Sequence, residues 1–139
     1  KKRKHLQKSR KYKKALERLT AVGSPNAPPC LAFVKAQEMA SRSSTTKRSS
    51  SSADLTVAYD RAIQMLAASK LLQFEGLANE RAGFTFSRLG RATESRKYFD
   101  RALDIYKNEW GAAAKHNWLQ RWVEASNIPA STITRAEDQ

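Results

Sequence analysis

The residues that could carry catalysis in this sequence are few, and their spacing assembles neither a catalytic nor a metal site. The histidines His5 and His116 have no partner at metal-ligand spacing, and the chain holds no H-E-x-x-H, C-x-x-C or P-loop sequence. The carboxylates Glu75 and Glu80 lie five positions apart, a spacing that does not bring them together on one helix face. We therefore expect no enzymatic activity and no cofactor in this segment.

A single cysteine, Cys30, limits the redox chemistry of the chain. One thiol forms neither an internal disulfide nor a four-cysteine zinc site, which favours a reducing compartment. Its neighbours Leu31 and Ala32 indicate a small apolar packing residue. No stretch approaches the ~20 apolar residues of a membrane span. We expect a cytoplasmic protein, with a nuclear location as the alternative.

Two tryptophans one helical turn apart, Trp118 and Trp122, could bind a ligand, although such pairs more often belong to a core or to a seat for another helix. With Leu119 and Val123 they place more large apolar side chains on the predicted final helix, 110–126, than one inward stripe requires. We expect one indole to fill the groove of the preceding helices and the other to be partly exposed. The pair is the candidate interaction edge.

Helix-forming residues dominate the elements that must position these side chains. Only four prolines and five glycines occur, and apolar residues recur at intervals of three and four without any alternating strand pattern. The sequence predicts an all-α chain of about six helices, at residues 3–22, 27–42, 53–71, 75–89, 91–107 and 111–126.

The N-terminal part, residues 1–26, is predicted to be a basic amphipathic helix and a turn. Tyr12, Leu16 and Leu19 recur at helical spacing as one apolar stripe. Gly23 follows where a helix end favours a left-handed residue.

The net charge of +13 is concentrated in this helix, because residues 1–18 hold ten Lys or Arg against one Glu. Such cations bind phosphate by counterion release, so a basic nucleic-acid-binding helical domain is the alternative function. Base stacking would need exposed aromatic residues among the charges, and Tyr12 is the only one there. A solvated helix start, a nuclear-import signal, and contact with acidic proteins or lipid are the other interpretations of the first cations, Lys1, Lys2, Arg3 and Lys4.

Residues 41–52 form a Ser-rich, low-complexity insertion without apolar anchors, and we expect a mobile loop there. Its serines follow Lys47-Arg48, a context suited to kinases that prefer basic sequences. This makes Ser49, Ser50 and Ser51 candidate phosphorylation sites, and an inert spacer is the alternative.

Residues 76–109 resemble the tetratricopeptide repeat, a helix–turn–helix unit of ~34 residues. Gly90 falls at the turn, Ser95 replaces a usual alanine, and Lys107 replaces the closing proline, so the turn before Trp110 is expected to differ. The residues that match the repeat pattern of small and large side chains are Gly83, Phe86, Phe99 and Ala102. A weaker copy, with Tyr59 and Ala62 at the same spacing, makes residues 27–75 a first helix pair that carries the insertion. Residues 127–139 are expected to form a flexible tail.

Two segments carry a more specific resemblance, residues 74–82 (FEGLANERA) and 106–115 (YKNEWGAAAK). They resemble the tetratricopeptide-like helical region that follows the ATPase module of large multi-sensor signalling proteins, which contain Ser/Thr-kinase-like and histidine-kinase domains. The resemblance implies an antiparallel helix-pair array that serves as a scaffold for protein–protein or interdomain interaction. Its partners would be other proteins or neighbouring domains of the same chain.

Overall fold

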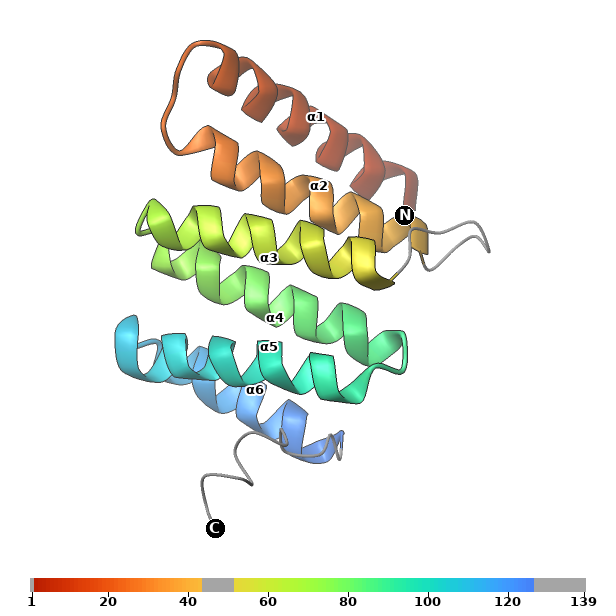
Figure 1. Ribbon diagram of the computed structural model, residues 1–139, viewed down its shortest axis with the longest axis vertical. Coiled ribbons are helices and arrows are strands. Elements are labelled where there is room, and N and C mark those ends of the chain that lie inside the picture. Colours follow the sequence, from red (N-terminus) through yellow and green to blue (C-terminus); the bar gives the residue numbers. More distant parts are fainter. Residues whose placement is uncertain (1, 44–51, 127–139) are drawn as a thin grey trace. The chain divides into compact units, whose positions relative to one another are not determined.

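The computed structural model describes residues 2–43 and 52–126, and the backbone of these residues forms six α-helices, one π-helical turn and no strand. The all-α prediction is therefore confirmed. In chain order the elements are α1 (Lys2–Ala21), α2 (Ala27–Ser43), α3 (Ser52–Ala68), α4 (Leu72–Arg88), α5 (Ala92–Asp104), the π-helical turn η1 (Ile105–Glu109) and α6 (Ala113–Ala125) (Figure 1). No helix in the described part of the chain is both long and apolar enough to cross a membrane.

The chain divides into two compact units between Leu71 and Leu72. Unit 1 contains α1, α2 and α3, and unit 2 contains α4, α5, η1 and α6. Successive helices within each unit run in opposite directions and lie side by side (Figure 1). The division lies four residues before the boundary at residue 76 that the repeat pattern suggests.

In unit 1, α2 packs against both α1 and α3. The buried apolar side chains of unit 1 come from α2 and α3, and they include Ala27, Ala36, Ala40, Leu55, Tyr59, Ala62 and Leu66. The hydroxyl of Tyr59 donates a hydrogen bond to Oε1 of Gln37. Helix α2 continues through Ser43, so Ser41 and Arg42 are helical and do not belong to the predicted loop, because an α-helix extends wherever no residue stops it.

Two of the three residues in the predicted apolar stripe of α1 are exposed. Tyr12 is 65% exposed and Leu19 is 47% exposed, whereas Leu16 between them is partly buried. The contact with α2 includes an ion pair of 3.0 Å between Lys13 Nζ and Glu38 Oε2. The predicted apolar stripe therefore lies mostly at the surface, and the contact of α1 with α2 includes the charged residue Lys13.

Three helix ends share one hydrogen-bond pattern, in which a left-handed residue closes the last turn. Gly23 and Gly90 have φ of +85° and +76°, and the N–H groups of Ser24 and Arg91 bond the carbonyls of Leu19 and Phe86 at 2.9 and 2.8 Å. At the end of α3 the same position is taken by Lys70, whose φ is 58°. The Cβ of lysine makes this conformation unfavourable by roughly 1–2 kcal/mol, whereas glycine adopts it freely.

Helices α4 and α5 of unit 2 approach closely because two glycines face aromatic rings. A Cβ on Gly83 would lie 2.6 Å from Cδ1 of Phe99, and a Cβ on Gly76 would lie 2.6 Å from Cε1 of Tyr106. The hydroxyl of Ser95 donates to the carbonyl of Gly83 at 2.7 Å, and both residues are buried. The serine that replaces the expected alanine is therefore small enough for the crossing and also bonds across it.

We expect Gly83→Leu to destabilise the protein by about 1–3 kcal/mol, because the added side chain must displace the Phe99 ring from a packed interior. Urea unfolding followed by circular dichroism measures the change. Arg81→Leu, at an exposed site two positions away on the same helix, serves as the control and should stay within about 0.5 kcal/mol of the parent. Equal stability of the Gly83→Leu variant and the parent would contradict the close approach.

Candidate functional site

Helix α6 divides its large apolar side chains between the core of unit 2 and the surface. Leu119 and Val123 are buried, and they join a cluster that includes Phe99, Ile105 and Tyr106. This inward pair fixes the rotation of α6 on α5 and η1, and it thereby sets the direction of the two tryptophans.

The two indoles lie in different environments, as the sequence analysis expected. Trp122 packs against the cluster, with ring centroids 4.6 Å from Phe84 and 5.4 Å from Phe99. Trp118 is 50% exposed, and the centroid of its ring lies 6.1 Å from that of Phe84. Phe84 therefore supports both indoles, and Trp118 presents the rest of its surface to solvent.

A second feature of unit 2 is a buried carboxylate on α4 that is paired with one arginine. The side chain of Glu75 is 5% exposed, and its Oε2 lies 3.0 Å from Nη2 of Arg101. Nη1 of the same guanidinium lies 2.9 Å from Oδ2 of Asp104 and 3.2 Å from Oε2 of Glu109. Partial burial lowers the pKa of Arg101, but the carboxylates, led by Glu75, raise it by more. This arginine joins α4, α5 and η1.

The other buried carboxylate of α4, Glu80, is 3% exposed and contacts the start of η1. The hydroxyl of Tyr106 donates to its Oε1 at 3.1 Å, and Nζ of Lys115 lies 3.6 Å from the same oxygen. The ammonium of Lys115 also lies 5.2 Å from the centroid of the Tyr106 ring. Burial first, and then the charge of Glu80, raises the pKa of Tyr106. The phenol therefore stays neutral and acts as a donor.

The π-helical turn between α5 and α6 forms where the sequence predicted a different turn. The N–H of Trp110 bonds the carbonyl of Ile105 at 2.7 Å, and the N–H of Ala112 bonds that of Tyr106 at 2.6 Å. Such wide turns are rare. Gly111 follows with φ of +71°, which lets the chain reverse into α6.

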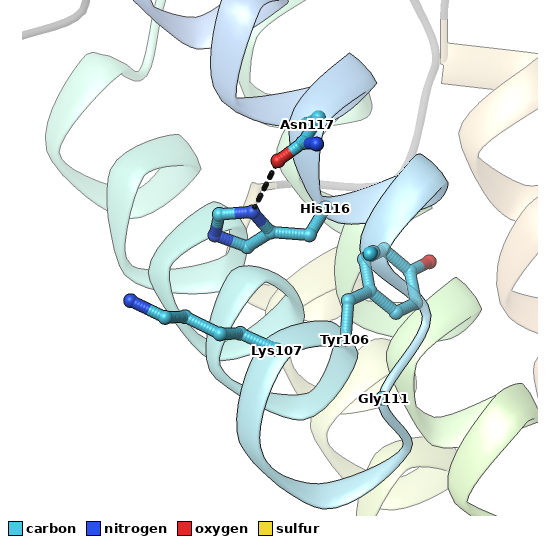
Figure 2. Close-up of a pocket in the computed structure, with 6 residues that line it drawn as sticks. Tyr106, Lys107, Gly111, His116 and Asn117 are labelled. Atoms are coloured by element: carbon cyan, nitrogen blue, oxygen red, sulfur yellow. Dashed lines mark hydrogen bonds between the residues drawn. The ribbon is translucent and has the colours of Figure 1, made fainter.

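A pocket of about 390 Å³ lies beside this turn, as Figure 2 shows. Its lining includes the ring of Tyr106, the exposed Lys107, and His116, whose Nδ1 lies 3.2 Å from Oδ1 of Asn117. Tyr106 and Lys107 are the other residues with acid–base groups in this lining, and the hydroxyl of Tyr106 already donates a hydrogen bond to Glu80.

The buried carboxylates of α4 are paired within unit 2. Glu75 faces the guanidinium of Arg101, and Glu80 faces the Tyr106 hydroxyl and the ammonium of Lys115. In the described part of the chain, no group of three or more His, Cys, Asp or Glu side chains is arranged to hold a metal ion.

Cys30, in unit 1, is partly buried, and burial raises the pKa of its thiol.

Most repeat-defining residues predicted from the sequence meet in the hairpin of α4 and α5. Phe86, Phe99 and Ala102 are fully buried, and the Phe86 ring stacks on Tyr98 with centroids 5.4 Å apart. These positions are compatible with a tetratricopeptide-like pair, which remains a prediction. Ser49, Ser50, Ser51 and Lys1 lie outside the described residues, as do the side chains of Lys2, Arg3 and Lys4.

The sequence analysis assigned no role to Glu75 and Glu80. It therefore did not predict the ion network, which these carboxylates form with Arg101, Tyr106 and Lys115. Their partners Arg101 and Tyr106 each lie 26 positions away, beyond the reach of helical periodicity.

Arg101→Met should destabilise the protein by about 1–3 kcal/mol, because it leaves the buried carboxylate of Glu75 without its charged partner. Lys97→Met, on an exposed part of the same helix, is the matched control and should change stability by less than about 0.5 kcal/mol. Chemical unfolding at neutral pH gives both values. Indistinguishable stabilities of the two variants would show that the Arg101 network contributes nothing.

The raised pKa of Tyr106 predicts a loss of stability in alkali. Above the ordinary tyrosine pKa of about 10, the unfolded chain releases this proton while the folded chain keeps it, so stability falls as the pH rises. Tyr106→Phe should reduce the steepness of this fall above about pH 10. The same steepness in Tyr106→Phe and the parent would contradict the burial of a neutral phenol.

Comparison of the chain with models of protein families, with curated proteins and with solved structures gives no match. The resemblance of residues 74–82 and 106–115 to the helical region of multi-sensor signalling proteins therefore stays a prediction from the sequence.

Proposed function

We propose that this chain is a helical repeat scaffold that binds a protein segment or a neighbouring domain within a signal-transduction ATPase or kinase. The observation that carries the proposal is Trp118. It is a large aromatic side chain, half exposed on α6, and the Phe84 ring supports it from below. Exposed tryptophans with one packed edge are frequent anchors of protein interfaces, because they bury much apolar area at little conformational cost.

The ion network supports the same proposal by making the surface rigid. Arg101 joins α4, α5 and η1, and Lys115 joins the start of α6 to Glu80 of α4. Because α6 is tied to α4 in this way, Trp118 is presented in one orientation. A preorganised anchor binds more tightly, since less freedom is lost on association.

The resemblance to signalling proteins gains a physical rationale from this network. Residues 74–82 contain Glu75 and Glu80, and residues 106–115 contain Tyr106, Glu109 and Lys115. The two segments that carry the resemblance therefore supply most of the groups that clamp α4 to the turn and to α6. This correspondence supports a shared architecture in which such a scaffold relays between an ATPase and its sensor domains.

The proposal is tested by placing a photo-crosslinking amino acid at position 118 and identifying the crosslinked protein or neighbouring domain. The affinity of that purified partner is then measured by calorimetry. Trp118→Ala should weaken binding about tenfold or more, as expected for an interface anchor. Trp110→Ala is the matched control, because Trp110 is 42% exposed at a different place in the unit, and it should change the affinity less than about twofold.

Two outcomes would contradict the proposed function. One is that both tryptophan variants weaken binding equally, which would indicate a general loss of structure. The other is that position 118 crosslinks only to nucleic acid.

Nucleic-acid binding is the second candidate function, and the exposed cations of α1 favour it. Lys8, Arg10, Lys11, Lys14 and Arg18 are all exposed, and phosphate contacts by such residues give steeply salt-dependent affinity. Retention on heparin or DNA that survives deletion of residues 1–18 would favour a nucleic-acid-binding domain. Loss of retention on that deletion would limit the effect to one basic helix.

A further inference from the structure

A separate surface of unit 1 has the features of a binding site for another helix. The exposed side of α1 and its first following residue carries four apolar residues, and three of them are large. Tyr12 is 65%, Leu19 47% and Val22 79% exposed, and Ala15 between them is also exposed. The N–H of Val22 bonds the carbonyl of Arg18 at 3.1 Å, so this residue continues the helical turn. We call Tyr12, Ala15, Leu19 and Val22 the α1 seam.

The spacing of the α1 seam fits one partner helix. Its residues are separated by three, four and three positions, which is the a–d–a–d pattern that packs one helix along another. The seam lies about 100° around the helix from the side that contacts α2, so the contact with α2 leaves it open. A membrane-surface helix needs an apolar face at least as wide as an ordinary core-facing stripe, whereas this one is narrower and is bordered by Lys11 and Arg18.

The charges beside the α1 seam define the chemistry of the partner. Lys8 lies in line with the seam, and Lys11 and Arg18 border it on the side away from α2. Glu17 is the only acidic residue of α1. Carboxylates on the partner would face these cations, whereas a second copy of α1 would bring cation against cation and cost binding energy. Phosphates of a nucleic acid would satisfy the cations but leave the apolar seam in water.

We infer that the α1 seam binds an acidic amphipathic helix, with apolar residues against Tyr12, Leu19 and Val22 and with carboxylates opposite Lys11 and Arg18. This surface lies in unit 1 and is independent of the proposed anchor Trp118 in unit 2. The result of one test therefore leaves the other proposal unaffected.

The test uses a fluorescent synthetic helix of four heptads with Leu at a and d and Glu at the flanking positions. Its glutamates repel one another and so oppose self-pairing. A second peptide with Lys in place of Glu is the charge control. Fluorescence anisotropy at low and at high salt measures the affinity of each peptide for the chain, and circular dichroism verifies that every variant is folded.

The double variant Tyr12→Ser/Val22→Ser should weaken binding of the acidic peptide about tenfold or more, because the apolar contacts are lost. Lys11→Glu/Arg18→Glu should weaken it as well and should raise the affinity for the basic peptide. Val57→Ser is the matched control. Val57 is 66% exposed on α3 of the same unit, so its replacement should leave the affinity within about twofold.

Several results would overturn the inference. One is failure of the acidic peptide to bind, and another is unchanged binding by Tyr12→Ser/Val22→Ser. A third is that a DNA duplex of about 20 base pairs, or phosphatidylserine vesicles, bind the chain more tightly than the acidic peptide does. In that case α1 would be a phosphate-binding or lipid-binding helix.

Discussion

The close approach of α4 and α5 determines most of what unit 2 presents to its surroundings. Gly83 and Gly76 have no side chain where the rings of Phe99 and Tyr106 cross α4, so the rings lie against the backbone. This contact brings α5 and η1 near enough for Arg101 and Tyr106 to reach the carboxylates of α4. Side chains at the two glycine positions would separate the helices and lengthen every polar contact between them.

The buried carboxylates then make the turn into α6 rigid. A buried charge is costly unless it is paired, so Glu75 and Glu80 strongly favour the arrangement in which their partners are in reach. The pairing involves the turn itself, because Glu109 and Tyr106 both lie in η1. The main effect of the ion network is therefore to favour one position of α6, and its net contribution to the free energy of unfolding is secondary.

Local chemistry made several features of this fold predictable from the sequence, and non-local pairing made others unpredictable. The glycine at 23 closes the end of α1 with a left-handed residue as expected, and the two tryptophans differ in exposure because one helix face cannot bury four large side chains. The partners of Glu75 and Glu80 could not be predicted, because each lies 26 residues away on another element. Periodicity placed Tyr12 and Leu19 on one stripe of α1, but it reports which residues share a face and not which face meets a neighbour, and both residues are exposed.

Lys70 makes the turn before the division between the two units less favourable than the equivalent turns built on glycine. The same helix-ending turn is built on glycine at 23 and 90, but on a residue with a Cβ at 70, one position before the units divide. Segments that open most easily in native proteins are those whose closed form is least favourable. The amides at the end of α3 belong to such a segment, so hydrogen exchange there would proceed through local opening while both units stay folded. Each unit could then act as its own cooperative folding block, with the strained turn as the boundary between them.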